Sequence, residues 1–115
     1  MIGFSRFRYW PPLTIALLTA GLVSEAHPQR PAPQRHVIVI NHFQNTPESL
    51  KVHTGDTVIW LNRDIVPHTV TGAGGAFDSG QIAPGKSWKL VTSTPGIFHY
   101  ICSLHPNMHG TLSIE

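Results

Sequence analysis

Three side chains that can bind a metal ion lie close together near the C-terminal end of the sequence. Cys102, His105 and Met108 offer a thiolate, an imidazole and a thioether at the spacing Cys-x2-His-x2-Met. A compact loop can aim all three donors at one ion. The spacing therefore predicts a metal site, although the cysteine or the methionine taken alone could be an ordinary packing residue.

One further imidazole would complete a donor set with defined chemistry. His68 is the candidate, because it follows Pro67 at the start of a predicted strand that could cross the domain. Two imidazoles, one thiolate and a weak axial methionine form the ligand set of a blue-copper electron-transfer centre. Cu(I) prefers soft sulfur and Cu(II) prefers nitrogen, so this mixed set accommodates both. The residues predict one type 1 copper ion per chain, bound by His68, Cys102, His105 and Met108.

The composition favours a small domain that is stabilised by a metal. The chain has 115 residues, of which 41% are hydrophobic and 12% are charged, so it is too apolar for a disordered tail. Its single cysteine cannot close an internal disulfide, whereas small exported domains usually need a disulfide or a metal. The 8 basic residues form no run, so we do not expect a nucleic-acid partner.

The N-terminal segment has the pattern of an export signal. Arg6 and Arg8 precede an apolar stretch at residues 13–23, and Ser24-Glu25-Ala26 places small residues suitably for cleavage after Ala26. The apolar stretch is shorter than the roughly 20 residues that a membrane helix needs, so we expect no stable membrane span. These features predict a signal peptide at residues 1–26, a proline-rich leader at residues 27–35, and a mature protein in the periplasm.

Residues 36–115 are expected to fold as one all-β domain. Runs of β-branched and aromatic residues alternate with turn signals such as Gly55-Asp56, Pro84-Gly85 and Pro95-Gly96. No window shows helical periodicity over three turns. Short strands at this spacing indicate a β-sandwich or barrel. The predicted strands lie near residues 36–41, 49–53, 57–62, 68–71, 86–92, 96–102 and 110–114.

The sequence also resembles the small cupredoxins, the type 1 blue copper proteins. The resemblance covers residues 36–115 and rests on residues 60–70 (WLNRDIVPHTV), 77–80 (FDSG), 84–85 (PG) and 96–110 (GIFHYICSLHPNMHG). The short loop between the cysteine and the methionine is most similar to amicyanin, since pseudoazurin and plastocyanin have longer loops. The resemblance implies an all-β Greek-key β-sandwich of about eight strands and a single-electron carrier. It also implies that His68, Cys102 and His105 lie in a trigonal plane with Met108 as the axial ligand.

Two positions depart from the pattern of the family. Thr69 stands where the family usually has an asparagine that braces the ligand loop, and Phe98 stands where a tyrosine is common. Thr69 can still offer a hydroxyl and a backbone N–H beside the ligands, so we expect the site to be retained with changed tuning. Pro67 and Pro106, next to the two histidines, are also expected beside the ligands, with the ring edge of His105 accessible to a partner.

The leading functional hypothesis is a monomeric, exported electron carrier. Its expected partners are redox proteins, such as a c-type cytochrome, a dehydrogenase or an oxidase, which dock transiently near His105. The resemblance suggests a quinoprotein amine dehydrogenase as one donor. The alternative is a periplasmic copper carrier or scavenger, but open Met/His-rich tracts suit that role better, and only Met1 and Met108 occur.

Enzymatic activity is not expected from this sequence. Copper enzymes with a related fold often carry a histidine beside the cysteine, whereas Ile101 and Ser103 flank Cys102 here. No set of nucleophile, base and acid suggests other chemistry. His109, beside the ligand loop, and His27, at the predicted mature N-terminus, remain candidates for binding a second copper ion.

Overall fold

The computed structural model describes residues 3, 5, 8–24 and 31–115. Residues 8–24 carry no helix or strand, and no helix in the described part of the chain is long and apolar enough to cross a membrane. The predicted cleavage site after Ala26 and the candidate ligand His27 lie outside the described residues. The folded domain begins with a strand at Arg35.

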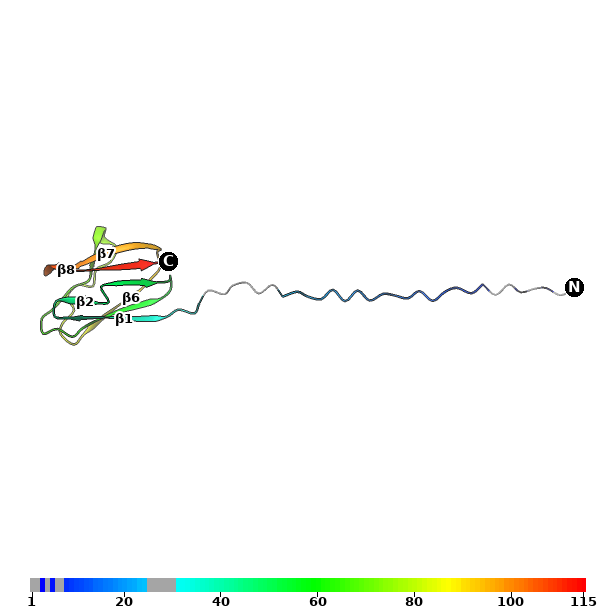
Figure 1. Ribbon diagram of the computed structural model, residues 1–115, viewed down its shortest axis with the longest axis horizontal. Helices are drawn as coiled ribbons and strands as arrows, with labels where there is room; N and C mark the ends of the chain where they lie inside the picture. The colour runs from blue at the N-terminus through cyan, green and yellow to red at the C-terminus, as the bar shows by residue number, and fades with distance from the viewer. Residues whose placement is uncertain (1–2, 4, 6–7, 25–30) are drawn as a thin grey trace.

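Eight strands form two four-stranded sheets that pack face to face (Figure 1). The first sheet has the order β2-β1-β4-β6 and the second has the order β3-β8-β7-β5. The pairs β1–β4 and β3–β8 are parallel and the other pairs are antiparallel. The strands are β1 (Arg35–Asn41), β2 (Gln44–Thr46), β3 (Ser49–Val52), β4 (Thr57–Asn62), β5 (Thr71–Gly72), β6 (Ser87–Val91), β7 (Gly96–Cys102) and β8 (His105–Ile114), with a short 3-10 helix η1 (Ala73–Gly75) after β5. The predicted all-β sandwich with about eight strands is confirmed.

The core lies between the two sheets and is filled from alternate positions of each strand. The β4 sequence TVIWLN is apolar on both faces, but Val58 and Trp60 are the residues that point inward and are fully buried. The Trp60 indole N–H donates a hydrogen bond to the Tyr100 hydroxyl, 3.2 Å away on the opposite sheet. Burial of that hydroxyl raises the pKa of Tyr100 to about 12. This bond joins the two layers in the middle of the core.

Gly110 makes room for the Tyr100 ring. The two residues are paired across β7 and β8, and a Cβ atom added at Gly110 would overlap the Tyr100 ring and hydroxyl. Because both residues are buried, neither can move away from the other without disturbing the core. The glycine therefore sets how closely the Tyr100 side chain approaches β8.

The strand boundaries differ from the prediction in three places, all near the predicted metal site. The expected strand at residues 68–71 is reduced to an isolated bridge between His68 and Ile82, followed by the two-residue strand β5. The backbone N–H groups of Thr69 and Val70 donate to side chains, the Cys102 sulfur and the Ser79 hydroxyl, so they are not free to join a strand ladder.

The other two differences concern β2 and β8. The sequence Gln44–Thr46 of β2 lacks a β-branched or aromatic run, and only its pairing with β1 makes it a strand. Strand β8 begins at His105 and not at residue 110, because Cys102 pairs with His105 across a two-residue turn. The predicted ligand loop is therefore the tip of a β-hairpin.

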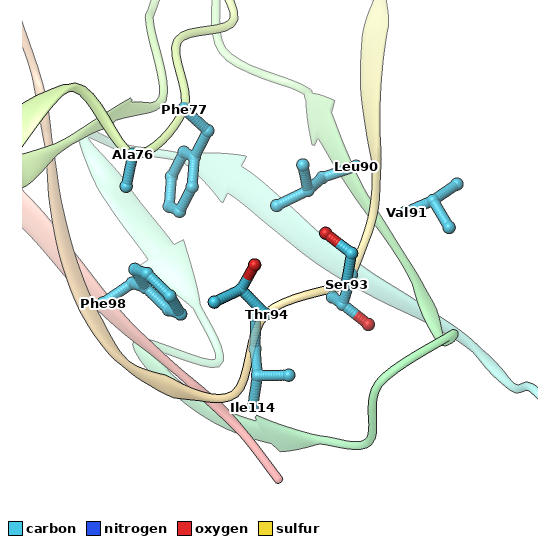
Figure 2. A pocket seen from close by; sticks show the side chains of 9 residues that line it. Ala76, Phe77, Leu90, Val91, Ser93, Thr94, Phe98 and Ile114 are labelled. Atoms are coloured by element: carbon cyan, nitrogen blue, oxygen red, sulfur yellow. The ribbon is translucent and has the colours of Figure 1, made fainter.

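A groove opens on the flank where the edge strands β5 and β6 are not paired with each other (Figure 2). Its volume is about 280 Å³. None of the four predicted copper ligands is among the residues that line it, which are Ala76, Phe77, Leu90, Val91, Thr92, Ser93, Thr94, Phe98 and Ile114. This flank is separate from the end of the sandwich where the predicted ligands gather.

Candidate metal centre

The β7–β8 hairpin positions the cysteine and the second histidine. Cys102 is the last residue of β7 and His105 is the first residue of β8, with Ser103 and Leu104 forming the turn. The Cys102 sulfur is buried in the core, and the His105 imidazole is partly exposed. The Cys102 Sγ atom lies 3.6 Å from the His105 Nδ1 atom. Both donor atoms thus face one point beneath the hairpin tip.

His68 reaches the same point from the loop between β4 and β5. Its backbone pairs with Ile82 through two hydrogen bonds, of 3.2 and 2.7 Å, and its side chain is fully buried. The His68 Nδ1 atom lies 3.7 Å from the Cys102 Sγ atom. The donor atoms of His68, Cys102 and His105 all lie within 4.8 Å of one another. The structure therefore brings together three of the four predicted ligands.

The dimensions of this group fit a single transition-metal ion. Bonds of roughly 2.3 Å to sulfur and 2.0 Å to nitrogen, separated by 120°, place sulfur and nitrogen about 3.7 Å apart. The two sulfur–nitrogen distances, 3.6 and 3.7 Å, agree with this value. Met108 follows on β8 with a buried side chain and lines the same hollow as His105. The four residues are arranged like a type 1 copper site.

Thr69 ties the loop that carries His68 to the hairpin that carries the cysteine. Its backbone N–H donates to the Cys102 Sγ atom at 3.3 Å, and its hydroxyl oxygen accepts the backbone N–H of Ser103 at 2.8 Å. The Thr69 hydroxyl also lies 3.1 Å from the Ser103 hydroxyl and 2.9 Å from the Thr71 hydroxyl. An N–H bond to a thiolate stabilises its negative charge. These contacts join the hydroxyl and the backbone N–H of Thr69 to the hairpin that carries Cys102.

The two prolines lie at the surface next to the histidines. Pro67 precedes His68 and Pro106 follows His105, and both are exposed. Pro106 lines a hollow of about 420 Å³ over the site, together with Phe43, Leu104, His105, Asn107 and Met108. The prolines therefore contribute to the surface around the site, and neither contributes a donor atom.

Asp64 is a functional residue that the sequence analysis did not assign. Its Oδ2 atom lies 2.9 Å from the His68 Nε2 atom, and the carboxylate is nearly buried. This contact fixes the His68 tautomer with the proton on Nε2, which leaves Nδ1 free to bind a metal. A histidine four residues after an aspartate was the available signal, but that spacing alone does not indicate that the two side chains meet.

The Asp64 carboxylate also accepts two backbone bonds. The N–H of Phe43 donates to Oδ2 at 2.9 Å and the N–H of Ile65 donates to Oδ1 at 3.2 Å. The Phe43 bond is the main cause that lowers the pKa of Asp64, against the opposing effect of burial, and the contact with His68 adds to it. Asp64 is therefore a stable anion beside the site, and it offsets the positive charge that a bound metal brings.

Phe43 is the second residue that the sequence analysis did not assign. Its ring packs edge-on against both candidate histidines, with centroids 4.8 Å from His105 and 5.4 Å from His68. The ring nevertheless remains about half exposed. No sequence signal indicated this role, because Phe43 lies in a hairpin turn far from the other site residues along the chain.

His109 does not join the donor group. Its ring lies 3.1 Å from the Glu48 carboxylate, and both side chains are largely exposed. Within the described residues, the group of His68, Cys102 and His105 is the one cluster of histidine, cysteine or acidic side chains that could hold a metal. Among the described residues, His109 belongs to no such group of three donors.

Comparison with known proteins identifies the family. The family model of the cupredoxin-like domain matches residues 13–114. Amicyanin-alpha of Methylorubrum extorquens is 30% identical over 105 residues, which cover 87% of each chain, and amicyanin of Paracoccus denitrificans is 35% identical over 75 residues, which cover 61% of this chain and 56% of the relative.

Solved structures agree with this match. A purple cupredoxin from Nitrosopumilus maritimus superposes with a TM-score of 0.66 at 26% identity, over 70% of this chain and 99% of that one. A Cu(I) form of an amicyanin mutant gives a TM-score of 0.67 at 27% identity, over 70% of this chain and 82% of that one. The chain therefore belongs to the cupredoxin-like family, as the resemblance of its sequence indicated.

Proposed function

We propose that this protein is an exported electron carrier that cycles one copper ion, bound by His68, Cys102, His105 and Met108, between Cu(II) and Cu(I). The observation that carries the proposal is the convergence of two imidazole nitrogens and one buried cysteine sulfur within 4.8 Å. Membership in the cupredoxin-like family supports it. Bound copper would supply the one-electron redox couple.

The residues around the ligands support fast electron transfer because they restrain the ligands before a metal binds. Asp64 fixes the His68 tautomer, Thr69 donates to the Cys102 sulfur, and the bonded pair of Trp60 and Tyr100 fixes the core below. Ligands that are held in one arrangement need little movement when the charge of the site changes. A small reorganisation between the two oxidation states is the property that an electron carrier requires.

The surface around His105 suits transient docking of a redox partner. Leu104 and Phe43 are about half exposed there, and Ile65, next to Asp64, is almost fully exposed. Arg63 and Lys86 are exposed beside Asn62, whose amide bonds to the loop that leads to His68. An apolar patch with basic neighbours favours a partner, such as a c-type cytochrome, a dehydrogenase or an oxidase, that has an acidic rim. The burial of His68, Cys102 and Met108 argues against the alternative role in copper exchange.

A copper titration tests the proposal. The full chain is expressed with its N-terminal segment, purified from the periplasm and titrated with Cu(II) beside a Cys102→Ala variant. We expect an intense thiolate-to-copper absorption band and narrow EPR hyperfine splitting, and we expect the variant to lose both. A pale, widely split spectrum that is the same in both proteins would refute the type 1 site. The mass of the purified protein tests cleavage after Ala26.

Electron self-exchange tests the docking surface. Two copies that meet through their apolar patches exchange electrons, and the rate is measured from NMR line broadening in mixtures of both oxidation states. Leu104→Lys places like charges opposite each other in that encounter, so we expect self-exchange to slow at least about tenfold. A matched Ile97→Lys variant, on an exposed β7 position outside the patch, should leave the rate unchanged. Equal effects of the two variants would contradict docking near His105.

A further inference from the structure

The turn between β1 and β2 has a backbone conformation that its residues do not favour. Asn41 pairs with Gln44, so His42 and Phe43 form a two-residue hairpin turn. Both central residues have positive φ angles, 50° for His42 and 58° for Phe43. Turns of this kind are usually built from Asn-Gly or Gly-Gly, because side chains with a bulky Cβ substituent are strained there. Strained backbone of this kind tends to occur at functional sites.

The Phe43 ring lies against both candidate imidazoles. The interplanar angles are 87° with His105 and 88° with His68, which is the favoured edge-to-face arrangement. The two imidazoles are themselves in contact, with centroids 5.1 Å apart. The Phe43 ring is thus packed on the candidate site while 48% of the residue remains exposed to solvent. A change in the tilt of either imidazole would require the Phe43 ring to move.

The backbone of Phe43 is fixed to the same residue that orients His68. The Asp64 Oδ2 atom accepts the Phe43 N–H at 2.9 Å and lies 2.9 Å from the His68 Nε2 atom. One nearly buried carboxylate therefore sets the position of the turn and the tautomer of the first histidine. The Asp64 carboxylate contacts the His68 imidazole directly. By holding the backbone of Phe43, it also helps to position the ring that packs against both His68 and His105.

We propose that Phe43 is a positioning residue of the metal centre. The strained turn and the bond to Asp64 hold the ring against both imidazoles, so that the imidazoles keep one orientation and solvent reaches His105 less easily. This inference rests on the proposed function, because it concerns the same ligands. Asn at position 43 would suit the backbone of the turn but would leave both imidazoles uncovered. The contact of the Phe43 ring with the imidazoles accounts for a strained Phe at this position.

Two substitutions in the same turn separate strain from positioning. Phe43→Asn and His42→Asn each place a residue that tolerates positive φ in the turn, and each retains the backbone N–H. Only the first removes a ring from the candidate site. We expect both apo variants to keep or raise the urea midpoint of unfolding. In the apo proteins we expect NMR relaxation to show faster motion of the His68 and His105 imidazoles in Phe43→Asn alone.

The copper-loaded proteins provide the second measurement. We expect Phe43→Asn to lose copper to a chelator roughly tenfold faster than the native protein, a size in keeping with two edge-to-face contacts. We also expect a shifted reduction potential and a shifted absorption band. His42→Asn should match the native protein, and Phe43→Tyr should restore native behaviour. If Phe43→Asn and His42→Asn behave alike in every measurement, Phe43 is an ordinary turn residue and the inference is wrong.

The outcomes also separate this inference from the proposed function. If the native protein forms no thiolate–copper band, the proposed function fails, and the apo NMR comparison still tests whether Phe43 restrains the imidazoles. If the native protein forms the band and the Phe43→Asn protein is unchanged, the inference fails alone. Should Phe43→Asn not fold, Phe43→Leu removes the aromatic edge while keeping an apolar side chain, and the same comparison applies to it.

Discussion

At the scale of single residues, the charge of Asp64 is the feature of the candidate site with the most direct electronic effect. The carboxylate lies 2.9 Å from the His68 imidazole and keeps its charge because its pKa is lowered. A nearby negative charge stabilises the more positive oxidation state of a bound metal. Asp64 should therefore favour Cu(II) over Cu(I) at the proposed centre.

Replacing Asp64 by Asn tests this effect. Asn can still accept the backbone N–H of Phe43, but it removes the negative charge beside His68. We expect the reduction potential of the copper protein to rise and its copper affinity to fall about 10–100-fold. The measurements are a redox titration and a competition with a chelator. A potential equal to that of the native protein would show that the Asp64 charge does not reach the metal centre.

Thr69 permits a second prediction at this scale. Its buried hydroxyl accepts the Ser103 N–H, so Thr69→Val leaves that donor without its partner while keeping the shape of the side chain. We expect the free energy of unfolding of the apo protein to fall by about 1–2 kcal/mol in urea denaturation. Ser103→Ala keeps the backbone bond and should cost less. A larger loss in Ser103→Ala would assign the bracing to the serine hydroxyl.

At the scale of elements, the contact between β7 and β8 depends on one small residue. Gly110 faces the Tyr100 ring, and a methyl group there would overlap it. Because the Tyr100 hydroxyl also accepts the Trp60 bond, the ring cannot shift without breaking the link between the sheets. The hairpin that carries Cys102 and His105 is therefore aligned by a contact deep in the core.

Gly110→Ala is expected to lower the free energy of unfolding by about 1–3 kcal/mol, the usual cost of overfilling a packed core. Urea denaturation of the apo protein measures it. The same change should weaken copper binding, because β8 continues directly from His105 to Gly110. A variant with native stability and native copper affinity would mean that Tyr100 has room to move.

The positions of the strands were predicted best where the hydrophobic pattern of the sequence sets the strand boundaries. Strands β1, β4, β6 and β7 lie within one residue of their expected positions, because their β-branched and aromatic runs are bounded by clear turns. Strand β2 has no such run, and the expected strand after His68 is replaced by bonds to side chains. The residue pattern of one segment does not show which strand or side chain will bond to it after folding. Those bonding partners decide the structure both in β2 and in the segment after His68.

The candidate site was predictable to the extent that its chemistry is local. Cys102, His105 and Met108 are within one hairpin, and His68 was found as the fourth donor because it follows Pro67 at the start of a predicted strand. Asp64 and Phe43 contact the candidate histidines through their side chains, and these contacts form only when the chain folds. Phe43 in particular contacts both histidines from the turn between β1 and β2. Its neighbour His42 is not part of the donor group of His68, Cys102 and His105.

At the scale of the whole molecule, Asp56 secures the end of the sandwich remote from the candidate site. Its carboxylate accepts the backbone N–H groups of Gln34 at 2.9 Å and His53 at 3.0 Å, and it lies 3.0 Å from the His36 imidazole. These bonds, with that of Gln34 the largest, lower the pKa of Asp56 to about 2. The carboxylate thus fixes the point at which the leader joins β1.

The lowered pKa gives the stability of the domain a defined pH dependence. The unfolded carboxyl titrates near about pH 3.9, so the stabilisation by Asp56 is complete above that pH and is lost as the pH falls towards about 2. Urea unfolding of the apo protein and of Asp56→Asn should therefore differ most at about pH 6, and the difference should shrink steadily as the pH falls to about 2. A difference that stays constant over this range would contradict the assignment.

The two ends of the folded domain lie together, at the pole where Asp56 and Glu115 sit (Figure 1). Strand β8 runs from His105 to Ile114, which separates the candidate centre from the C-terminus by roughly 30 Å. A tether on either terminus would therefore hold the molecule by the end that lies away from the candidate centre. The tether could lead to a membrane, an electrode or a fused redox enzyme. The pole around His105 would then face outward, so that one attachment chemistry would orient a whole layer of the protein for electron exchange.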